Sequence, residues 1–381
     1  MKDQTRIWGD SYERDLQNPQ DIIAVEIEVA DALAKRALNQ LPHDAEPASA
    51  INRDAFEAYL EGRFFWNKRT TESLTKAVSY FQKAIQYDSA YAPAYAGLAD
   101  CYSLLGSAPF TALAPKEAFL KSEEAARKAL ELDGSLAEAH VSLAYSELVY
   151  HRDFIAAKKE FQEAIRLRPA YPTAHQYYGY YLTSIGRLDE AIKEREVARE
   201  LDPLSPLMNS ALGEAFYQAR EFDRTIEQNQ KSLELDPSYA ISLVNLGRAF
   251  EQQGKYELAL DTFGKILAAA PDDPAVLALV GHADAASGRR TDAHKILSKL
   301  EQVQTRRYVP ALYFAMIYTG LNDKDKSFAW LDKAYEEHCE YLVYLPTEPM
   351  ADPLRGDPRF SRLLSRLGLK PVATLAALRM H

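Results

Sequence analysis

The sequence predicts an all-α protein built as a solenoid of stacked helix–turn–helix units, and three observations carry that prediction. Prolines recur every 34 residues through the middle of the chain, at Pro169, Pro203, Pro237 and Pro271. Glycines recur at the same interval, at Gly179, Gly213, Gly247 and Gly281. Each interval contains two segments with apolar residues at helical spacing. Such a period is typical of repeat proteins, in which each unit packs only on its neighbours.

One unit, residues 239–271, shows how an interval is built. Its first predicted helix ends at Gly254, because glycine punctuates a helical pattern. A second helix is expected from about 256 to 269. Apolar residues follow helical spacing along both helices: Leu243, Leu246, Phe250, Ala259, Phe263 and Ile266. Pro271 lacks a backbone N–H donor, so it suits the start of the next unit better than a helix interior.

These positions resemble the tetratricopeptide repeat, a 34-residue helix–turn–helix unit. The resemblance implies a right-handed superhelix of about eight units over residues 51–340. The first two units carry insertions, and the third has one extra residue in its turn. Glu147 and Asp284 stand where the repeat expects an apolar residue. Either those units are locally shifted, or each charge is paired nearby.

The N-terminal segment, residues 1–50, does not follow the repeat. Its run Ile7-Trp8-Gly9-Asp10-Ser11-Tyr12-Glu13-Arg14, followed by a predicted helix, resembles the tail of a TolB-like domain. In that family the repeat array follows a winged-helix DNA-binding domain, a Ser/Thr kinase or a nucleotide cyclase. The resemblance implies a regulatory or sensory arm of a bacterial signalling protein. The sequence contains none of those output domains, so their activity is not carried over.

The C-terminal segment, residues 341–381, also departs from the repeat. Four prolines precede Arg359, and an amphipathic stretch then places apolar residues at Phe360, Leu363, Leu364 and Leu367. Terminal units of a solenoid expose an apolar face that must be covered. We therefore expect an extended strap and a final helix that cap the end of the array.

Composition and charge exclude several classes of function. With 45 basic and 55 acidic residues the net charge is −10, which argues against a nucleic-acid-binding surface. No stretch approaches the roughly 18 apolar residues of a membrane span, and the start lacks the apolar core of a signal peptide. Cys101 and Cys339 lie far apart, which excludes a disulfide framework and a cysteine zinc site. We expect a cytoplasmic protein.

No motif indicates catalysis, a cofactor or a metal. The patterns GxGxxG, GxSxG and HExxH are absent. Gly247 and Gly254-Lys255 imitate a phosphate-binding loop, but six residues separate the glycines where the loop needs four. His140 and His175 occupy packing positions of their units, so a structural role is favoured for both. We therefore predict no enzymatic activity, no cofactor and no metal site.

The resemblance implies that the first helix of each unit lines a concave groove that binds the partner. Repeat positions place the following side chains there: Tyr59, Arg63, Trp66, Tyr145, Gln176, Tyr180, Glu214, Tyr217, Asn245, Arg248, Glu251 and His282. Tyrosine suits recognition because it combines contact area with a polar handle. An alternative is that Tyr145 and Tyr180 simply pack against the adjacent helix. Alanine at Tyr180, Tyr217 and Arg248 is expected to abolish partner binding with little change in melting.

The sequence therefore predicts a non-enzymatic scaffold that binds a protein or peptide, as the regulatory arm of a bacterial signalling or transcription-regulating protein. One alternative is a small-molecule sensor with a pocket between the first units and the insertion Gly106–Pro115. A second is a fragment of a larger enzyme whose catalytic domain is absent. Nucleic-acid and membrane partners are not expected, and a homo-oligomer is left open.

Overall fold

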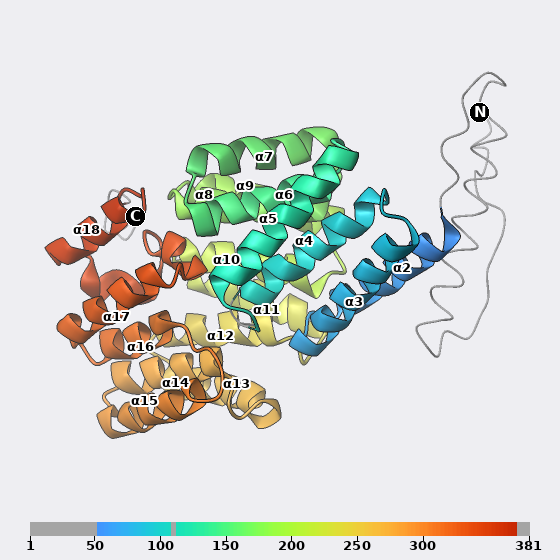
Figure 1. The fold of residues 1–381 in the computed structure, drawn as a ribbon. Helices are drawn as coiled ribbons and strands as arrows, with labels where there is room; N and C mark the ends of the chain where they lie inside the picture. The colour runs from blue at the N-terminus through green and yellow to red at the C-terminus, as the bar shows by residue number, and fades with distance from the viewer. Residues whose placement is uncertain (1–51, 108–111, 372–381) are drawn as a thin grey trace, which may run out of the picture.

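The computed structural model describes residues 52–107 and 112–371, which are helical and contain no strand (Figure 1). The predicted N-terminal segment 1–50, with its TolB-like motif, lies outside the described residues. Eight helix pairs follow one another. Their first helices are α2 (Arg53–Asn67), α4 (Ala92–Gly106), α6 (Ala137–Ser146), α8 (Pro172–Ser184), α10 (Pro206–Gln218), α12 (Ala240–Gln252), α14 (Pro274–Ala286) and α16 (Ala311–Gly320). Their second helices are α3 (Thr71–Tyr87), α5 (Pro115–Leu132), α7 (Phe154–Leu167), α9 (Leu188–Leu201), α11 (Phe222–Leu235), α13 (Tyr256–Ala269), α15 (Arg290–Gln304) and α17 (Lys324–Glu336).

Each helix packs against its own partner and against the next unit, as the repeat pattern predicts. The first helices contact one another in series from α4 to α16, and each second helix contacts the first helix that follows it. This arrangement leaves the first helices on the inside of the array and the second helices on the outside (Figure 1). The predicted all-α solenoid of about eight helix–turn–helix units is confirmed.

The repeated glycines have two different physical roles. Gly247 lies where α12 crosses α13, and a Cβ atom there would overlap the ring of Phe263. Close approach of the two helices therefore offsets the cost of glycine in mid-helix, which is about 1 kcal/mol against alanine. Gly254 lies in the turn with φ +72°, a left-handed conformation that side chains disfavour. The 34-residue recurrence of glycine thus marks one packing position.

The two misplaced acidic residues have separate explanations. Glu147 opens η1 (Glu147–His151), a π-helical turn that takes up the extra residue of the third unit. The third unit is therefore locally shifted, and Arg127 lies 3.5 Å from the Glu147 carboxylate. Asp284 keeps its repeat position and accepts a hydrogen bond of 2.8 Å from Arg289 Nε. Both acidic residues are thus paired with an arginine, and at Glu147 the unit is locally shifted as well.

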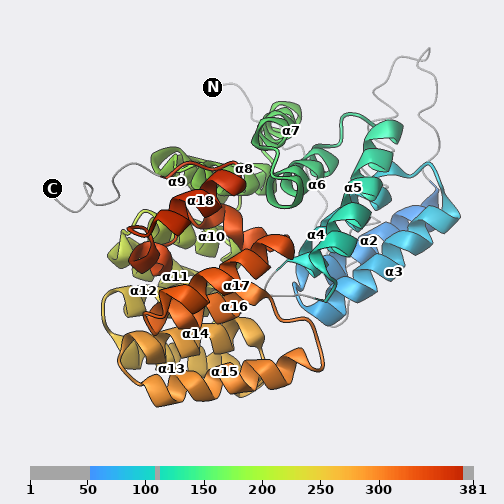
Figure 2. The same ribbon diagram turned by 60° about the vertical axis from the view of Figure 1, so that its left-hand side comes forward.

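The array turns far enough for its last units to meet its third unit. Arg152 donates a hydrogen bond of 3.2 Å to the carbonyl of Tyr335, which lies in α17. The ring of His338 lies tilted against that of Tyr150, with centroids 4.8 Å apart. In Figure 2, which views the array from another side, the red helix α18 overlies the green helices α8 and α9. The solenoid therefore encloses its concave side.

The segment after α17 fills part of that concave side. We call residues 339–357 the strap; it contains two 3-10 turns, η2 (Glu340–Tyr344) and η3 (Pro349–Leu354), and leads into α18 (Pro358–Arg366). Helix α18 packs on α17, as expected of a cap. The strap itself departs from the expectation, because η2 contacts α8 and η1 while η3 contacts α16. Because the array closes, apolar side chains lie on both sides of the strap, and the strap packs inside the array rather than over its end.

Candidate functional site

The strap is bound by the concave face through its carboxylates. Tyr145 on α6 donates a hydrogen bond of 2.8 Å to Glu340. Arg220, in the turn after α10, donates one of 2.6 Å to Asp352 and one of 3.1 Å to the carbonyl of Thr347. These contacts come from units far apart in the sequence. The inner face of the array therefore binds a non-repeat segment of its own chain.

Glu348 is the most heavily bound of the strap carboxylates. It accepts hydrogen bonds from Arg248 Nη2 at 2.6 Å, Tyr217 Oη at 3.1 Å and Gln218 Nε2 at 3.3 Å, and one from the backbone N–H of Met350. Burial alone would raise the pKa of Glu348, but Arg248 and these donors outweigh it and lower the pKa. The pair is therefore ionised at neutral pH, and it joins the strap to α12.

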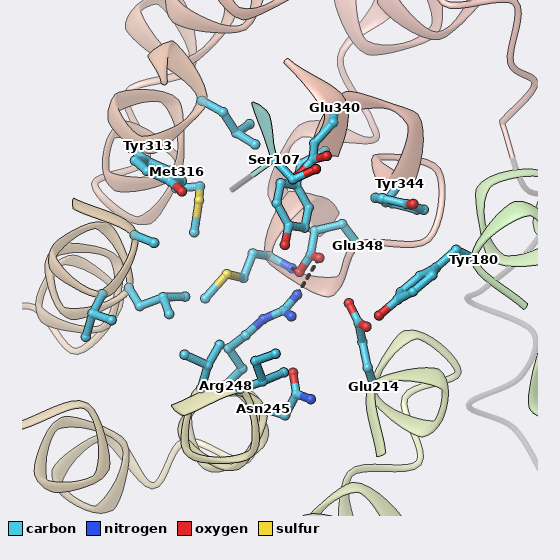
Figure 3. Close-up of a pocket in the computed structure, with 18 of the residues that line it drawn as sticks. Ser107, Tyr180, Glu214, Asn245, Arg248, Tyr313, Met316, Glu340, Tyr344 and Glu348 are labelled. Atoms are coloured by element: carbon cyan, nitrogen blue, oxygen red, sulfur yellow. Dashed lines mark hydrogen bonds and ion pairs between the residues drawn. The ribbon is translucent and has the colours of Figure 1, made fainter. Parts of the chain in front are cut away.

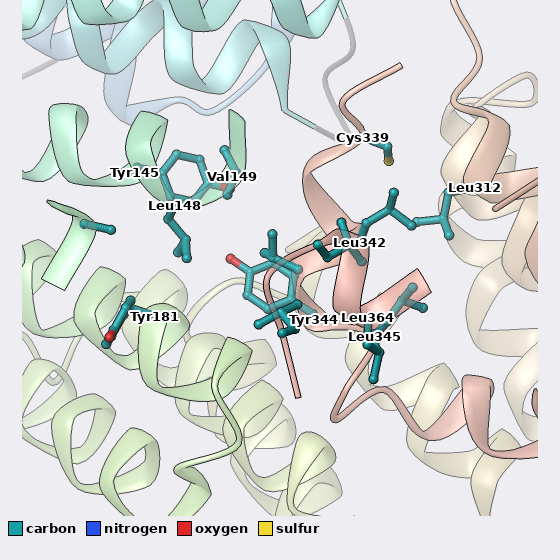
Figure 4. Packing of buried hydrophobic residues seen from close by; sticks show 14 of the residues in the cluster. Tyr145, Leu148, Val149, Tyr181, Leu312, Cys339, Leu342, Tyr344, Leu345 and Leu364 are labelled. Carbon is teal, nitrogen blue, oxygen red and sulfur yellow. The ribbon is translucent and has the colours of Figure 1, made fainter. Parts of the chain in front are cut away.

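Apolar packing fixes the strap as firmly as its charges do. Leu342 and Val343 are fully buried, and Leu345 is 5% exposed. They belong to a core cluster that also contains Leu148 of the third unit and Leu312 of the eighth (Figure 4). A fully buried side chain of this size contributes about 1.5–3 kcal/mol. The strap is therefore an integral part of the core, and the central groove expected to be open is filled.

The predicted groove residues divide into groups once they are placed. Tyr145, Tyr217 and Arg248 contact the strap. The side chains that border a central cavity include Gln176, Tyr180, Glu214, Asn245 and again Arg248. Tyr217 is fully buried, and Gln176 and Asn245 are each 2% exposed. We now expect alanine at Tyr217 and Arg248 to lower the melting temperature, because both residues bind the strap in the interior.

Two further groove residues, His282 and Glu251, form a buried pair. His282 Nδ1 is hydrogen-bonded to Glu251 Oε1, and the two residues are 5% and 3% exposed. Burial lowers the pKa of His282, but the Glu251 carboxylate outweighs burial and leaves the pKa raised. His140 and His175 have comparable partners, since each lies within 2.7 Å of a glutamate on the second helix of its unit. All three imidazoles join helices.

The remaining predicted residues lie in the first unit. Arg63 stacks on Trp66, with its guanidinium carbon 4.1 Å from the ring centroid, and its Nη1 lies 3.2 Å from Asp100 on α4. Arg69 covers Trp66 as well, at 3.7 Å. Tyr59 packs near Phe81, with ring centroids 5.7 Å apart. The hydrogen bonds of the strap to first helices go to α6, α10 and α12. This part of the concave face is instead formed by α2 and α4, which the Arg63–Asp100 hydrogen bond joins.

A cavity of about 300 Å³ lies between the first helices and the strap (Figure 3). Helices α8, α10 and α12 form one side, and α14, α16 and the strap form the other. Leu104 and Ser107 border it from the second unit, so it reaches the neighbourhood of the expected Gly106–Pro115 pocket. Most of its lining comes from later units. Sequence reasoning missed this cavity because its wall includes the strap.

The sequence also missed the residues that hold the strap. Glu340, Glu348 and Asp352 lie outside the repeat, so no repeat position predicts their partners. One feature of the sequence does single out Arg220: it stands at the turn position that Gly254 occupies in the next unit. Its φ is 65°, a conformation in which a non-glycine residue is uncommon. The described residues contain no group of three or more His, Cys, Asp or Glu side chains arranged to hold a metal ion.

Together these features define an α-helical repeat protein whose concave side is closed by its own C-terminal segment. The tetratricopeptide repeat family matches residues 144–206, 210–274 and 251–312. Residues 144–312 of the chain are thus built from tetratricopeptide repeats. No helix in the described part of the chain has the length and apolar character needed to cross a membrane.

Comparison with known proteins adds a regulator and several repeat structures. The transcriptional regulator HilA of Salmonella typhimurium is 29% identical over 162 residues, which are 42% of this chain and 29% of HilA. The chain therefore spans less than a third of the length of the curated relatives it matches. The human IFIT1 dimer with PPP-AAAA is 17% identical with a TM-score of 0.58, covering 80% of this chain and 73% of that one. TTC0263 of Thermus thermophilus, a TPR protein, is 18% identical with a TM-score of 0.44, covering 51% and 98%. At 17% identity the likeness to IFIT1 shows the fold alone.

Proposed function

We propose that this chain is a non-enzymatic scaffold that binds a protein or peptide, as the regulatory arm of a bacterial signalling or transcription-regulating protein. Tetratricopeptide arrays are protein-interaction scaffolds, and the match to HilA supports the regulatory setting. One observation carries the proposal: the inner face already holds a non-repeat polypeptide segment, its own strap, through tyrosine and arginine side chains. The chemistry of peptide recognition is therefore built into this face.

The partner binds the part of the concave face formed by α2 and α4. Arg63 is partly exposed there, with 25% of its side chain accessible, and stacks on Trp66. Tyrosine, tryptophan and arginine are the residues that most often dominate binding energy at interfaces. The filled centre of the array leaves no room for a second chain beside the strap. The first two units are the inner surface left for an external segment.

A peptide selection tests this proposal directly. Random extended peptides displayed on phage are selected on the full chain, and the enriched peptides are measured by isothermal titration. Arg63→Ala should weaken them at least tenfold, because it removes the guanidinium that stacks on Trp66. The matched control is Arg166→Ala, an exposed arginine on the outer helix α7 whose side chain pairs with Glu163.

Circular dichroism distinguishes a lost surface from a lost fold. The Arg63 variant should keep its helical content, since Asp100 retains its 2.6 Å hydrogen bond from Ser142. Peptides that bind both variants equally would overturn the proposed surface. Failure to enrich any peptide in repeated selections would overturn the peptide-binding function itself.

A further inference from the structure

We propose that the central cavity is a binding site for a small organic ammonium ion with an apolar body. The proposal concerns α8, α10, α12, α16 and the strap, and it is independent of partner binding at α2 and α4. The cavity of about 300 Å³ lies at the small end of the range for ligand pockets.

The wall of the cavity contains hydrogen-bond acceptors that a ligand with N–H groups could contact. Gln176 is 2% exposed, borders the cavity, and its Oε1 has no hydrogen-bond partner among the described residues. Glu214 extends into the cavity from α10 (Figure 3), and its nearest cation is Arg195 Nη1 at 3.7 Å. A buried acceptor without a donor is costly, by about 1–3 kcal/mol. A ligand that brings N–H groups would satisfy the Gln176 Oε1 atom and place a further donor beside Glu214.

Aromatic rings surround the same end of the cavity. Tyr180 and Tyr344 lie on the same side of the Glu214 carboxylate in Figure 3, with ring centroids 6.1 Å apart. Tyr177 approaches Tyr180 edge-on at 5.7 Å. Ring faces attract cations by about 0.5–2 kcal/mol, more when water is excluded. One face of Tyr180 is already covered by Arg195, at 4.1 Å, so the cavity offers the ligand the other rings and the carboxylate.

The charges around the cavity favour a cation over an anion. Its wall includes four carboxylates, Glu214, Glu340, Glu348 and Asp273, against the two arginines Arg69 and Arg248. Arg248 is bound to Glu348, and Arg69 is stacked on Trp66. Arg195 behind Tyr180 adds a third cation and still leaves one negative charge in excess. Burial raises the pKa of the Tyr344 phenol, and Glu340 and Glu214 raise that pKa further, as a negative local potential requires.

Much of the remaining cavity wall is apolar. It is formed chiefly by aliphatic and thioether side chains: Ile241, Val244, Leu279, Leu312 and Met316. Figure 3 places Met316 on the side away from Glu214 and Tyr180. A ligand with a charged head and a hydrocarbon body would therefore fit in one orientation, with its head at Glu214. Small amines without a hydrocarbon chain lack the apolar surface that this wall would bury.

Isothermal titration of the full chain with matched probes tests the site. Hexylamine, hexanol and hexanoate share one hydrocarbon body, and benzyltrimethylammonium replaces N–H donors with methyl groups. We expect hexylamine to bind at one site per chain, at least tenfold tighter than hexanol, with no binding of hexanoate. The methyl protons of benzyltrimethylammonium should shift upfield in NMR spectra, because aromatic rings lie beside them.

Variants decide which residues bind the head group. Glu214→Gln should weaken hexylamine at least tenfold, and Gln176→Leu, a second variant on another helix, should weaken it several-fold. The control is Glu227→Gln, an exposed glutamate of α11 that pairs with Lys231 and should change nothing. Equal binding of hexylamine and hexanol would overturn the proposal in favour of an apolar or water-filled cavity. Absence of binding by every amine, or unchanged binding to Glu214→Gln, would overturn it as well.

Discussion

Two parts of one concave face, built from the same repeat, have different roles in this protein. In the first unit, Arg63 pairs with Asp100 at a partly exposed site. In the sixth unit, Arg248 pairs with Glu348 beneath the strap, with 12% of the arginine side chain exposed. Both arginines line the inner face at the first helix of a unit. Whether such a position is a surface or a core therefore depends on what covers it.

The largest difference in stability between the two regions is expected at their tyrosines. Tyr217 is fully buried, contacts Arg248 at 4.0 Å through its ring, and donates to Glu348. Tyr217→Ala should destabilise the chain by about 4 kcal/mol, because removal of a large buried ring leaves a cavity. Tyr59→Ala in the first unit should be milder, by about 2 kcal/mol, since Tyr59 is partly exposed. Urea denaturation followed by circular dichroism measures both.

Tyr217→Phe is the matched control for that experiment. It keeps the ring and removes only the hydroxyl, so we expect a loss of about 1 kcal/mol. If Tyr217→Ala and Tyr59→Ala proved equally mild, the strap would not be part of the core, and the distinction between the two regions would fail.

The two arginine–carboxylate pairs also distinguish the covered region from the exposed one, with stability losses similar to or smaller than those at the tyrosines. Arg248→Ala leaves Glu348 buried without its cation and should cost about 3 kcal/mol, the penalty of breaking a buried ion pair. Arg63→Ala should cost about 1 kcal/mol, because Asp100 keeps the hydrogen bond from Ser142. Chemical denaturation measures the difference, and Arg248→Lys should recover part of the loss. Equal costs for the two alanine variants would contradict the assignment of Arg248 to the interior.

The free energy of unfolding should also depend on pH through a buried pair on the filled side of the array, His282 and Glu251. The pKa of His282 is raised in the folded chain by Glu251, so the folded state binds a proton more tightly than the unfolded state. Its contribution to the free energy of unfolding is full below the unfolded pKa of about 6.5. That contribution is lost as the pH rises through the higher folded pKa.

His282→Gln should therefore flatten the decline in stability above neutral pH. The pKa values of His140 and His175 are raised too, so part of the decline should remain in the variant. Thermal melts at several pH values measure the slope. A wild-type slope that His282→Gln leaves unchanged would show that the pair does not titrate as described.

The sequence predicted the units and the helix faces because both depend on local pattern. Pro271, Gly247 and Phe263 define a helix pair whatever lies beyond it. The filled groove could not be predicted, since contacts such as Arg248–Glu348 join residues 100 positions apart through closure of the whole array. Arg195 shows a second limit: it occupies the position that Phe161 and Phe263 fill in other units, yet it is fully buried. Its partners, the Ala211 carbonyl and the Tyr180 ring, lie outside its own helix.

The smallest expected effect separates the two regions most sharply, because it changes the same turn position in each. Arg69 has φ 50° and Arg220 has φ 65°, and both follow the first helix of a unit. Glycine at either site relieves left-handed strain of about 1 kcal/mol. Arg69→Gly also loses a cation–π contact worth about 0.5–1 kcal/mol, so the free energy of unfolding should stay nearly constant.

Arg220→Gly instead loses the hydrogen bonds to Thr347 and Asp352, which outweigh the relief, and we expect net destabilisation of about 1–2 kcal/mol. Asn322→Gly, with φ 57° in the eighth unit, serves as the control for strain alone. If urea titration gave Arg220→Gly the same stability as Arg69→Gly, the turn arginine would not hold the strap.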